Sequence, residues 1–373
     1  MQPEAVVVLE PGEFPVTRTG KVSRRELAEG FEQGRYEGIQ LMSASGGEEG
    51  WVDEVTLSGD VRKMAELWQH CLGLPELPGP EVNFYDVGGD SMSGVSLIHD
   101  AEKAFQRQVD VSAFFTNPTV LGLCESLLPV GGEKAPVLVR LNSAVSGVPL
   151  FLIPGGKGTP NELMVFASLA RKFATQRPVF GLRAPSERYG EGKGLTVAEL
   201  ASLYREVIKE EQTEGPYLIC GEYIAGVVSQ ELARQLAAEG DPVGSLLLLD
   251  AVCPTEERSR SFEADGLDRM TEKHGPGLGK RAYSYFRELH RFRPVPSDVD
   301  TTIIATATMV DSVGRDLGWG DTVGEGLRVE LLPEDHDSYI REEAEVTGRL
   351  IGRILDEASG LVSNSEGESA VVI

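Results

Sequence analysis

Basic residues are scarce in this chain of 373 residues. Lysine and arginine together number 35, against 59 aspartates and glutamates, so the formal net charge is -24 at pH 7. Proteins that bind nucleic acid or an anionic membrane surface depend on lysine and arginine to neutralise phosphates. We therefore expect no nucleic-acid partner and no membrane partner.

Cysteines and long apolar runs are also few. The four cysteines, Cys71, Cys124, Cys220 and Cys253, are widely spaced and lie in or beside apolar stretches. This distribution is typical of reduced core cysteines rather than of a disulfide framework or a zinc site. No apolar run reaches the roughly 18 to 20 residues that cross a bilayer, and the N-terminus MQPEAVVVLEPGE lacks the basic start of a signal peptide. We expect a cytoplasmic protein without a metal site.

The pattern of apolar residues changes along the chain. Hydrophobic residues make up 41% of the sequence, enough for sizeable cores, and the length favours two or three domains. From about 55 to 128 the apolar residues recur at helical spacing, which predicts a small helical bundle. Short apolar runs then alternate with amphipathic segments, which predicts a parallel sheet covered by helices. The predicted strands are PLFLIPG, PVFGLRA, YLICG, SLLLLDA, TTIIATA and RVELLP.

A GGDS run at 88–91 stands in the segment NFYDVGGDSMSGVSLI, directly before an amphipathic helical pattern. Two glycines allow a turn that exposes the next side chain, and the start of a helix favours an incoming phosphodiester. On this pattern alone, Asp90 or Ser91 could equally be a simple N-cap. The segment resembles the core motif of peptidyl carrier proteins, which has an aromatic pair, GGDS and an apolar residue, here Met92 in place of the more usual leucine.

The resemblance to carrier proteins implies a cofactor at Ser91. In that family a phosphopantetheinyl transferase uses coenzyme A to attach 4′-phosphopantetheine to the serine that follows the GGD turn, so that Asp90 lies beside the attachment point. The thiol of this arm carries acyl, aminoacyl or peptidyl groups as thioesters. We expect Ser91 to be the attachment site of a carrier domain.

The N-terminal segment PVTRTGKVSRREL resembles the final motif of adenylation domains, with Lys21 at the position of that family's catalytic lysine. The simpler alternative is a solvated lysine in a loop. The nucleotide-binding bulk of such a domain is missing from the sequence, so we expect no adenylation and interpret Lys21 as a relic. The resemblance implies that upstream synthetase modules, or an adenylation domain, are partners of this chain and that it is the end of a longer synthetase.

The segment GPYLICGEYIAGVVSQELARQLAAEG predicts a strand, a sharp turn and a helix, which is the setting of the nucleophile elbow G-x-S-x-G. Tyr223 occupies the tip, where that motif has serine. SLLLLDA places Asp250 after the next strand, and LLPEDHDSYI places His336 after the last strand. These segments resemble thioesterases that end nonribosomal peptide synthetases, which implies that Asp250 is the acid and His336 the base; Asp311 is the alternative acid.

Further parts of the thioesterase resemblance lie around the elbow. The loop IPGGKG offers the backbone N–H of Gly155 or Gly156 for an oxyanion hole, and Ile224 offers the second N–H. A plain turn is the alternative for the two glycines. The stretch from about 254 to 297 resembles the helical lid of the family. Cys220, three residues before the tip, is interpreted as a core residue of the strand.

We therefore expect a multidomain fold, with a small all-α carrier bundle and an α/β-hydrolase domain that has a mostly parallel sheet and a helical lid. Segments rich in glycine and serine, such as SASGGEEG, mark the joints. In chain order we expect an adenylation remnant at 1–32, a linker at 33–54, a phosphopantetheine carrier domain at 55–128, a linker at 129–146, a thioesterase-like domain at 147–359 and a tail at 360–373.

The functional question is what tyrosine does at the elbow. A phenol, with a pKa near 10, ionises more readily than serine, but its ring carries the oxygen past an oxyanion hole built for a serine ester. We expect a carrier that presents an acyl or peptidyl thioester to a domain without serine-type hydrolysis. The alternatives are an active product-releasing thioesterase or cyclase that uses Asp250 and His336 as a general base, or one that uses Tyr223 as an unusual nucleophile. If only the nucleophile is missing, Tyr223→Ser should raise thioester hydrolysis strongly.

Overall fold

The computed structural model describes most of the two predicted domains. The described residues are 59–89, 91–129, 136–155, 160–173, 176–185, 194–323, 326–333, 335–336, 338–340 and 343–358. The predictions for Lys21, Asp90 and Gly156 fall outside these residues, as do the predicted adenylation remnant, the first linker and the tail.

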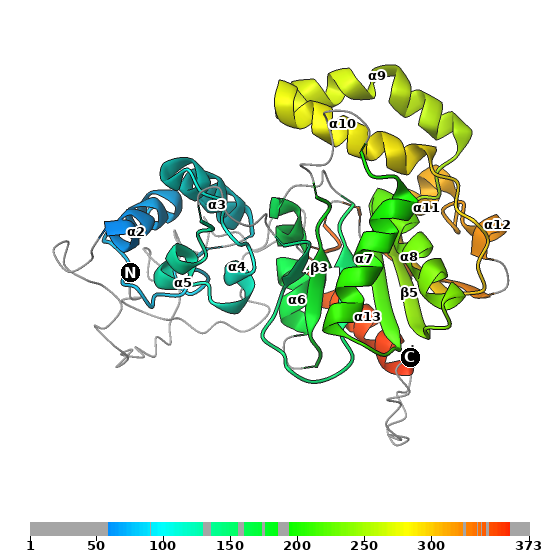
Figure 1. Ribbon diagram of the computed structural model, residues 1–373, viewed down its shortest axis with the longest axis horizontal. Coiled ribbons are helices and arrows are strands. Elements are labelled where there is room, and N and C mark those ends of the chain that lie inside the picture. Colours follow the sequence, from blue (N-terminus) through cyan, green and yellow to red (C-terminus); the bar gives the residue numbers. More distant parts are fainter. Residues whose placement is uncertain are drawn as a thin grey trace, which may run out of the picture.

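The N-terminal part of the described chain is the predicted all-α bundle, which Figure 1 shows in blue to cyan beside the larger domain. Its helices are α2 (Gly59–Leu72), α3 (Ser91–Phe105), α4 (Ala113–Thr116) and α5 (Val120–Glu125). Met64, Ala65 and Trp68 form the buried face of α2. Phe84 meets Trp68 and Phe114 edge to face, at ring distances of 5.0 and 5.1 Å, the arrangement that aromatic quadrupoles favour. This aromatic cluster holds the loop before α3 against the bundle.

The larger domain is built on a sheet of seven strands in the order β1-β3-β2-β4-β5-β6-β7. The strands are β1 (Leu138–Arg140), β2 (Leu150–Ile153), β3 (Val179–Leu182), β4 (Tyr217–Glu222), β5 (Val243–Leu249), β6 (Thr301–Thr306) and β7 (Leu327–Leu332). All pairs are parallel except β1 with β3. The six predicted strands are confirmed. The inner strands appear in the sequence as short continuous apolar runs because they are buried on both faces, whereas β7, at the edge of the sheet, is only partly buried.

The seventh strand, β1, was not predicted and corrects the second linker. It lies inside 129–146 and pairs antiparallel with β3, with Val139 opposite Gly181. The sheet therefore takes up part of the chain that was predicted to be a joint. Three residues carry too little periodicity to be recognised as a strand, and only the pairing with β3 defines this one.

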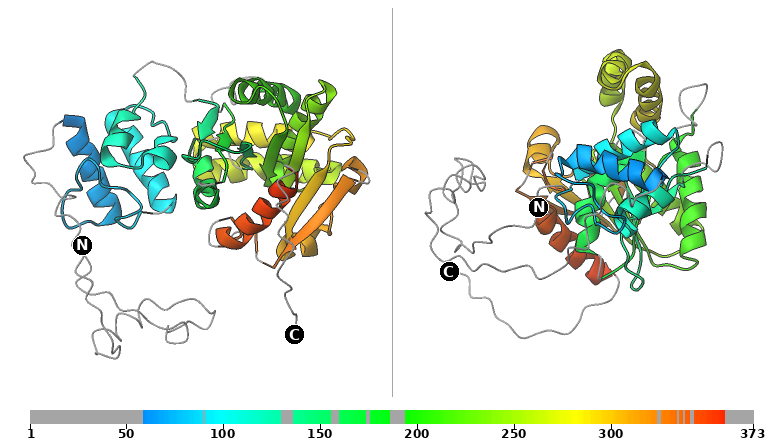
Figure 2. Two further views of the ribbon diagram at one scale, coloured as in Figure 1. Left: turned by 90° about the horizontal axis from the view of Figure 1, so that it is seen from below. Right: turned by 90° about the vertical axis from the view of Figure 1, so that its left-hand side faces the viewer.

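Helices cover both faces of the sheet. Leu150 and Leu152 of β2 belong to one core with Leu169 and Ile351, whereas Phe151 and its face belong to a second core, since successive strand residues point to opposite faces. The first face is covered by α6 (Ala167–Lys172) and α13 (Ala344–Ala358), and the second by α7 (Val197–Glu211) and α8 (Gly226–Ala238). Figure 2, left, shows α13 in red across the sheet from the green helices. The remaining short helices are η1 (Pro160–Phe166), η3 (Tyr223–Ala225), α11 (Ala307–Val313) and α12 (Gly320–Val323).

Two long helices, α9 (Glu256–His274) and α10 (Pro276–Arg291), form the predicted lid at the top of Figure 1. Phe262 of α9 stacks on Tyr283 and His290 of α10, at ring distances of 5.5 and 4.4 Å. The helix α10 also contacts the elbow segment η3. The lid is therefore packed directly over the position of the predicted nucleophile.

The bundle and the larger domain touch through α3 and η1. Gly94 of α3 faces Met164, and a Cβ at Gly94 would lie 2.9 Å from Cε of Met164. Nearby, the Arg171 guanidinium lies 4.6 Å from the centre of the Tyr85 ring, within cation–π range. Burial raises the pKa of Tyr85, although Arg171 acts in the opposite direction. Absence of a side chain at Gly94 is thus what allows the two surfaces to approach.

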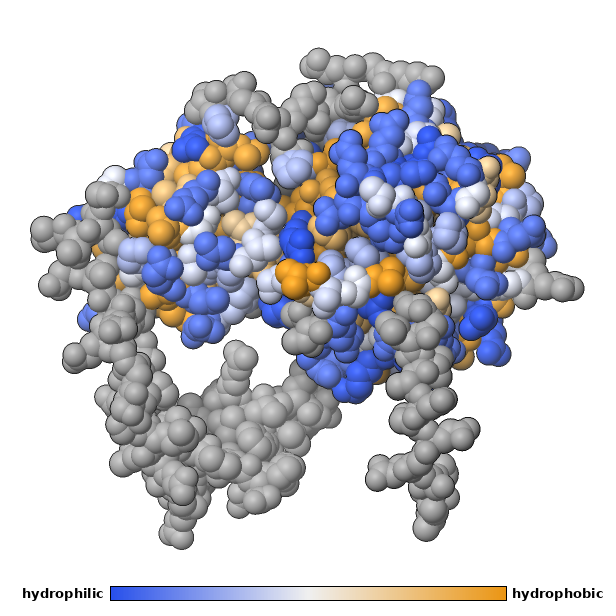
Figure 3. Space-filling view, turned by 60° about the horizontal axis from the view of Figure 1, so that its bottom comes forward, coloured by the Kyte–Doolittle hydropathy of each residue, from blue (hydrophilic) through white to orange (hydrophobic). Residues whose placement is uncertain are grey.

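The surface of the molecule is mixed in hydropathy. On the face shown in Figure 3, hydrophobic residues occur in separate small groups among hydrophilic ones. None of the helices in the described ranges is long and apolar enough to cross a membrane. The four cysteines all lie within the described residues and form no disulfide there; Cys220 and Cys253 are buried, whereas Cys71 and Cys124 are half-buried.

Candidate active site

The elbow keeps its strained backbone although its tip has changed. Tyr223 follows β4 with φ of +48°, a left-handed conformation that is uncommon outside glycine and that clusters at functional sites. A Cβ at Gly221 would lie 2.1 Å from Oγ of Ser229, and one at Gly226 would lie 2.5 Å from Cβ of Ala251. Strand and helix therefore approach so closely that only glycine fits at these two positions. The predicted strand, turn and helix are present.

The structure brings Asp250 and His336 together. Asp250 follows β5 and is fully buried, and its Oδ2 lies 3.0 Å from Nδ1 of His336. Thr306, at the end of β6, donates its N–H to Oδ1 of Asp250 at 2.6 Å and its hydroxyl to Oδ2 at 2.7 Å. These donors compensate the burial of the carboxylate, which then holds the imidazole in one orientation. The alternative acid, Asp311, is exposed on α11.

The sequence analysis missed Thr306 as a partner of Asp250. Its place at the end of a predicted strand could have revealed it, because the carboxyl ends of neighbouring parallel strands meet at one edge of the sheet.

The phenol of Tyr223 lies beside the imidazole of His336, with 5.0 Å between the ring centres and a 50° tilt. Tyr223 is 38% exposed. Burial of its hydroxyl raises the pKa above the usual value near 10, and the charge of Glu222 raises it further, while Arg258 and Arg269 of the lid act against this. The phenol is therefore neutral at pH 7 and a weak nucleophile.

Glu222, the last residue of β4, was missed by the sequence analysis. Its Oε2 accepts a hydrogen bond from the N–H of Gly155 at 2.5 Å. A Cβ at Gly155 would lie 2.4 Å from the carbonyl oxygen of Glu222 and 2.7 Å from Cβ of Tyr223. The loop after β2 therefore runs directly against the elbow, and the predicted oxyanion donor of Gly155 already has a carboxylate partner. The predicted second donor belongs to Ile224, whose side chain is buried.

Ser91 is the first residue of α3, as predicted, and heads a helix of 15 residues. Gly88 has φ of +95°, which side chains rarely adopt. A Cβ at Gly89 would lie 2.3 Å from the ring of Phe84. Two glycines are thus required to turn the chain into α3, and the helix start favours a phosphodiester at Ser91. This local structure fits the attachment of 4′-phosphopantetheine.

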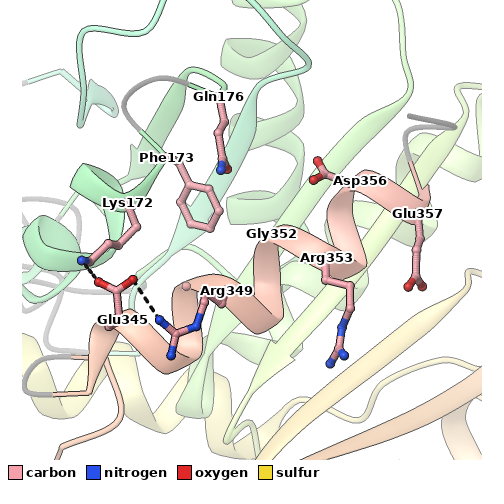
Figure 4. A pocket seen from close by; sticks show the side chains of 10 residues that line it. Lys172, Phe173, Gln176, Glu345, Arg349, Gly352, Arg353, Asp356 and Glu357 are labelled. Atoms are coloured by element: carbon pink, nitrogen blue, oxygen red, sulfur yellow. Dashed lines mark hydrogen bonds and ion pairs between the residues drawn. The ribbon is translucent and has the colours of Figure 1, made fainter. Parts of the chain in front are cut away.

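A separate hollow of about 580 Å³ lies between α6 and α13 (Figure 4). Three of its charged side chains pair with one another, since Glu345 accepts from both Lys172 and Arg349. The lining residues are Lys172, Phe173, Gln176, Glu345, Gly348, Arg349, Gly352, Arg353, Asp356 and Glu357. This lining comes from α6, the turn after it and α13, so the hollow is distinct from the elbow.

Comparisons with known proteins agree with this geometry. The family model described as a phosphopantetheine attachment site matches residues 62–127, and the model described as a thioesterase domain matches residues 148–355. The chain is 30% identical over 389 aligned positions to the probable nonribosomal peptide synthetase CymA of Salinispora arenicola (strain CNS-205), which covers 92% of this chain and 5% of CymA. It is 27% identical over 286 positions to indigoidine synthase of Dickeya dadantii (strain 3937), covering 77% of this chain and 18% of that protein.

One solved structure matches almost the whole chain. The structure of holo-AB3403, a four-domain nonribosomal peptide synthetase bound to AMP and glycine, superposes with a TM-score of 0.52 at 20% identity. The match covers 92% of this chain and 28% of that protein, and at this identity it shows a common fold. The chain therefore belongs to the thioesterase-domain family, in the arrangement of nonribosomal peptide synthetases, with a phosphopantetheine carrier domain in front of the thioesterase domain.

Proposed function

We propose that this chain holds an acyl or peptidyl thioester on the pantetheine arm at Ser91 and presents it to a thioesterase-like domain without serine-type hydrolysis. The observation that carries the proposal is the elbow itself. Tyr223 has the strained backbone of a nucleophile position, beside a bonded Asp250–His336 pair, but carries a neutral phenol. The arm supplies the thiol that carries the acyl group.

The chemistry of a serine ester explains why tyrosine does not replace it. A serine hydroxyl attacks when the adjacent imidazole takes its proton, and the ester that forms lies with its oxygen at the oxyanion donors. The ring of Tyr223 carries its oxygen several bonds further from the same backbone, beyond those donors. In a protease with a comparable triad, loss of the nucleophile lowers turnover by about a millionfold. We therefore infer that acyl groups persist on the carrier.

The contact between the two domains supports a role in presentation. Gly94, which faces Met164 of η1, lies three residues after Ser91 on the same helix, a spacing of about 4.5 Å along the helix axis. η1 belongs to the connection that leaves β2 and passes Gly155. An arm attached to Ser91 would thus start near the loop that borders the elbow.

The proposal includes the partners implied by the two domains. A phosphopantetheinyl transferase with coenzyme A loads Ser91, and upstream synthetase modules or an adenylation domain supply the acyl or peptidyl group. A cytoplasmic location fits four cysteines that form no disulfide within the described residues.

A second candidate function rests on the intact acid–base pair. If His336 removes a proton from water or from a nucleophile within the substrate, that oxygen or nitrogen bonds to the thioester carbon. The carbon–sulfur bond then breaks, and the thiolate receives the proton, releasing an acid or a ring. The retained contact of 3.0 Å between Asp250 and His336 favours this candidate. The length of the Tyr223 side chain, which carries its oxygen beyond the oxyanion donors, argues against the phenol as a nucleophile.

Intact-protein mass spectrometry distinguishes the two candidates. The chain is loaded with butyryl-coenzyme A and a broad-specificity pantetheinyl transferase, and the acylated mass is followed at pH 7.5. We expect the butyryl group to persist equally in the unchanged protein, in Tyr223→Phe and in His336→Ala. Rapid loss from the unchanged protein that His336→Ala abolishes would instead establish release by the acid–base pair.

A further inference from the structure

We propose that the carboxylate of Glu222 occupies the oxyanion site of the elbow and is a second block to acyl transfer, separate from Tyr223. The inference rests on the proposed function and deepens it, because it states what else the thioesterase-like domain has lost. Glu222 occupies the position directly before the tip of the elbow, the first x of G-x-S-x-G, where the motif specifies no residue type.

The contact that carries the proposal is the hydrogen bond from Gly155 to Glu222. The N–H of Gly155 is one of the two donors expected from the loop after β2, and Oε2 of Glu222 accepts a hydrogen bond from it at 2.5 Å. A carboxylate binds such a donor about twice as strongly as a neutral acceptor does. A substrate carbonyl would have to displace this carboxylate before it could use the N–H.

The position of the carboxylate matches the position of a reacting oxygen. The point at which Gly155 would carry a Cβ lies 2.7 Å from both Oε2 of Glu222 and Cβ of Tyr223. Oε2 and the elbow tip therefore both lie close to Gly155. An acyl group on a side chain at 223 would place its oxygen close to Gly155 as well, since the donors of an oxyanion hole surround the nucleophile.

The negative charge of Glu222 should hinder acyl transfer electrostatically as well as by occupying space. Transition-state stabilisation at this site depends on fixed donors directed at developing negative charge, and a carboxylate there both removes a donor and repels that charge. The charge of Glu222 is felt at residue 223, because it contributes to the raised pKa of the phenol. Loss of a single oxyanion donor lowers kcat by about 10²- to 10³-fold in a well-studied protease.

If Tyr223 and Glu222 each block acyl transfer, hydrolytic activity should return fully only when both residues are replaced. Tyr223→Ser supplies a hydroxyl next to His336 but leaves the carboxylate on Gly155, so its gain should be limited. Glu222→Gln removes the charge at constant size, and Glu222→Ala empties the site. Each should add a large gain in the Tyr223→Ser background and little on its own.

The experiment compares full-length Tyr223→Ser with Tyr223→Ser/Glu222→Gln and Tyr223→Ser/Glu222→Ala. Hydrolysis of S-butyryl-N-acetylcysteamine is measured together with the affinity for butylboronic acid, whose tetrahedral adduct with serine places an anionic oxygen at the site. We expect both double variants to exceed Tyr223→Ser at least about tenfold in kcat and in boronate affinity. Tyr223→Ser/Glu257→Gln is the matched control, because it removes the same charge from an exposed position of the lid, and should equal Tyr223→Ser.

A further measurement does not depend on a restored nucleophile. In the otherwise unchanged protein, Glu222→Ala should move the amide proton of Gly155 upfield in a spectrum of ¹⁵N-glycine-labelled chain, since it loses a charged acceptor. Equal kcat and boronate affinity in Tyr223→Ser and both double variants, or an unmoved Gly155 amide, would overturn the inference. Failure of the proposed function has a different signature, which is rapid loss of the butyryl group from Ser91 in the unchanged protein.

Discussion

The carrier domain and the thioesterase-like domain differ in whether the backbone of the site still carries the side chain that its chemistry needs. In the carrier, the glycine turn, the start of α3 and Ser91 occur together. In the larger domain, the left-handed backbone at residue 223 and the bonded Asp250–His336 pair are retained, but the side chain at the tip is a phenol. The contrast shows that packing can preserve the backbone of a site after its chemistry has changed, because neighbouring glycines and buried strands impose the elbow.

The largest effect should be seen at the carrier. Ser91→Ala removes the hydroxyl that accepts the phosphopantetheine group, so we expect complete loss of arm attachment in the presence of coenzyme A and a transferase. Intact-protein mass spectrometry gives the result directly. Ser96→Ala, on the exposed side of the same helix, is the matched control and should load normally. Retention of the added mass in Ser91→Ala would show that the arm is attached at another residue, and the carrier domain would then no longer differ from the larger domain in this way.

Smaller effects, on stability, should distinguish two reasons why the domains require glycine: lack of space for a side chain at Gly221 and a left-handed backbone at Gly88. At Gly221 a Cβ would meet Oγ of Ser229 at 2.1 Å, whereas Gly88 has open space and φ of +95°. We expect Gly221→Ala to lower the free energy of unfolding by about 3 kcal/mol through overpacking. Gly88→Ala should cost about 1 to 2 kcal/mol through backbone strain. Urea titrations measure both values.

Ser229→Ala should restore part of the stability lost in Gly221→Ala, since it removes the first atom that the new methyl group meets. The same change should not help Gly88→Ala. If Ser229→Ala is without effect in both backgrounds, the elbow is not limited by space, and the argument that packing preserves its shape fails.

The final effect concerns the acid stability of the lid. His290 stacks on Phe262, and burial lowers its pKa from 6.5 to about 4, with Arg269, Arg258 and Arg293 adding to the shift. The folded state therefore disfavours the charged imidazole. This contribution to stability is complete above pH 6.5 and is lost as the pH falls towards 4.

His290→Phe keeps the stacked ring and removes the titration. We expect its melting temperature to fall less between pH 7 and pH 4.5 than that of the unchanged protein, by a difference equivalent to about 1 to 3 kcal/mol. Parallel pH curves for the unchanged protein and His290→Phe would show that the lid histidine is not the group involved.

Most of the fold could be predicted because its signals are local. Runs such as SLLLLDA are continuous and apolar, so they indicate buried parallel strands without knowledge of their neighbours. The strand β1 was missed because three residues have no clear period, and its pairing with β3 depends on residues that lie 40 to 44 positions away along the chain. Asp250 and His336 were recognised by their places after strands, and the structure brings them to 3.0 Å.

By itself, the sequence determined the residue types available for chemistry: Ser91 after two glycines, Tyr223 at the elbow tip, and an acid and a base after two strands. Only the tertiary structure decided which groups those residues meet. Glu222 and Gly155 are 67 positions apart, and their hydrogen bond of 2.5 Å exists because β2 and β4 are neighbours in the sheet. The physical reason is that side-chain identity is a local property, whereas the field and the donors around a reacting atom come from segments that folding brings together.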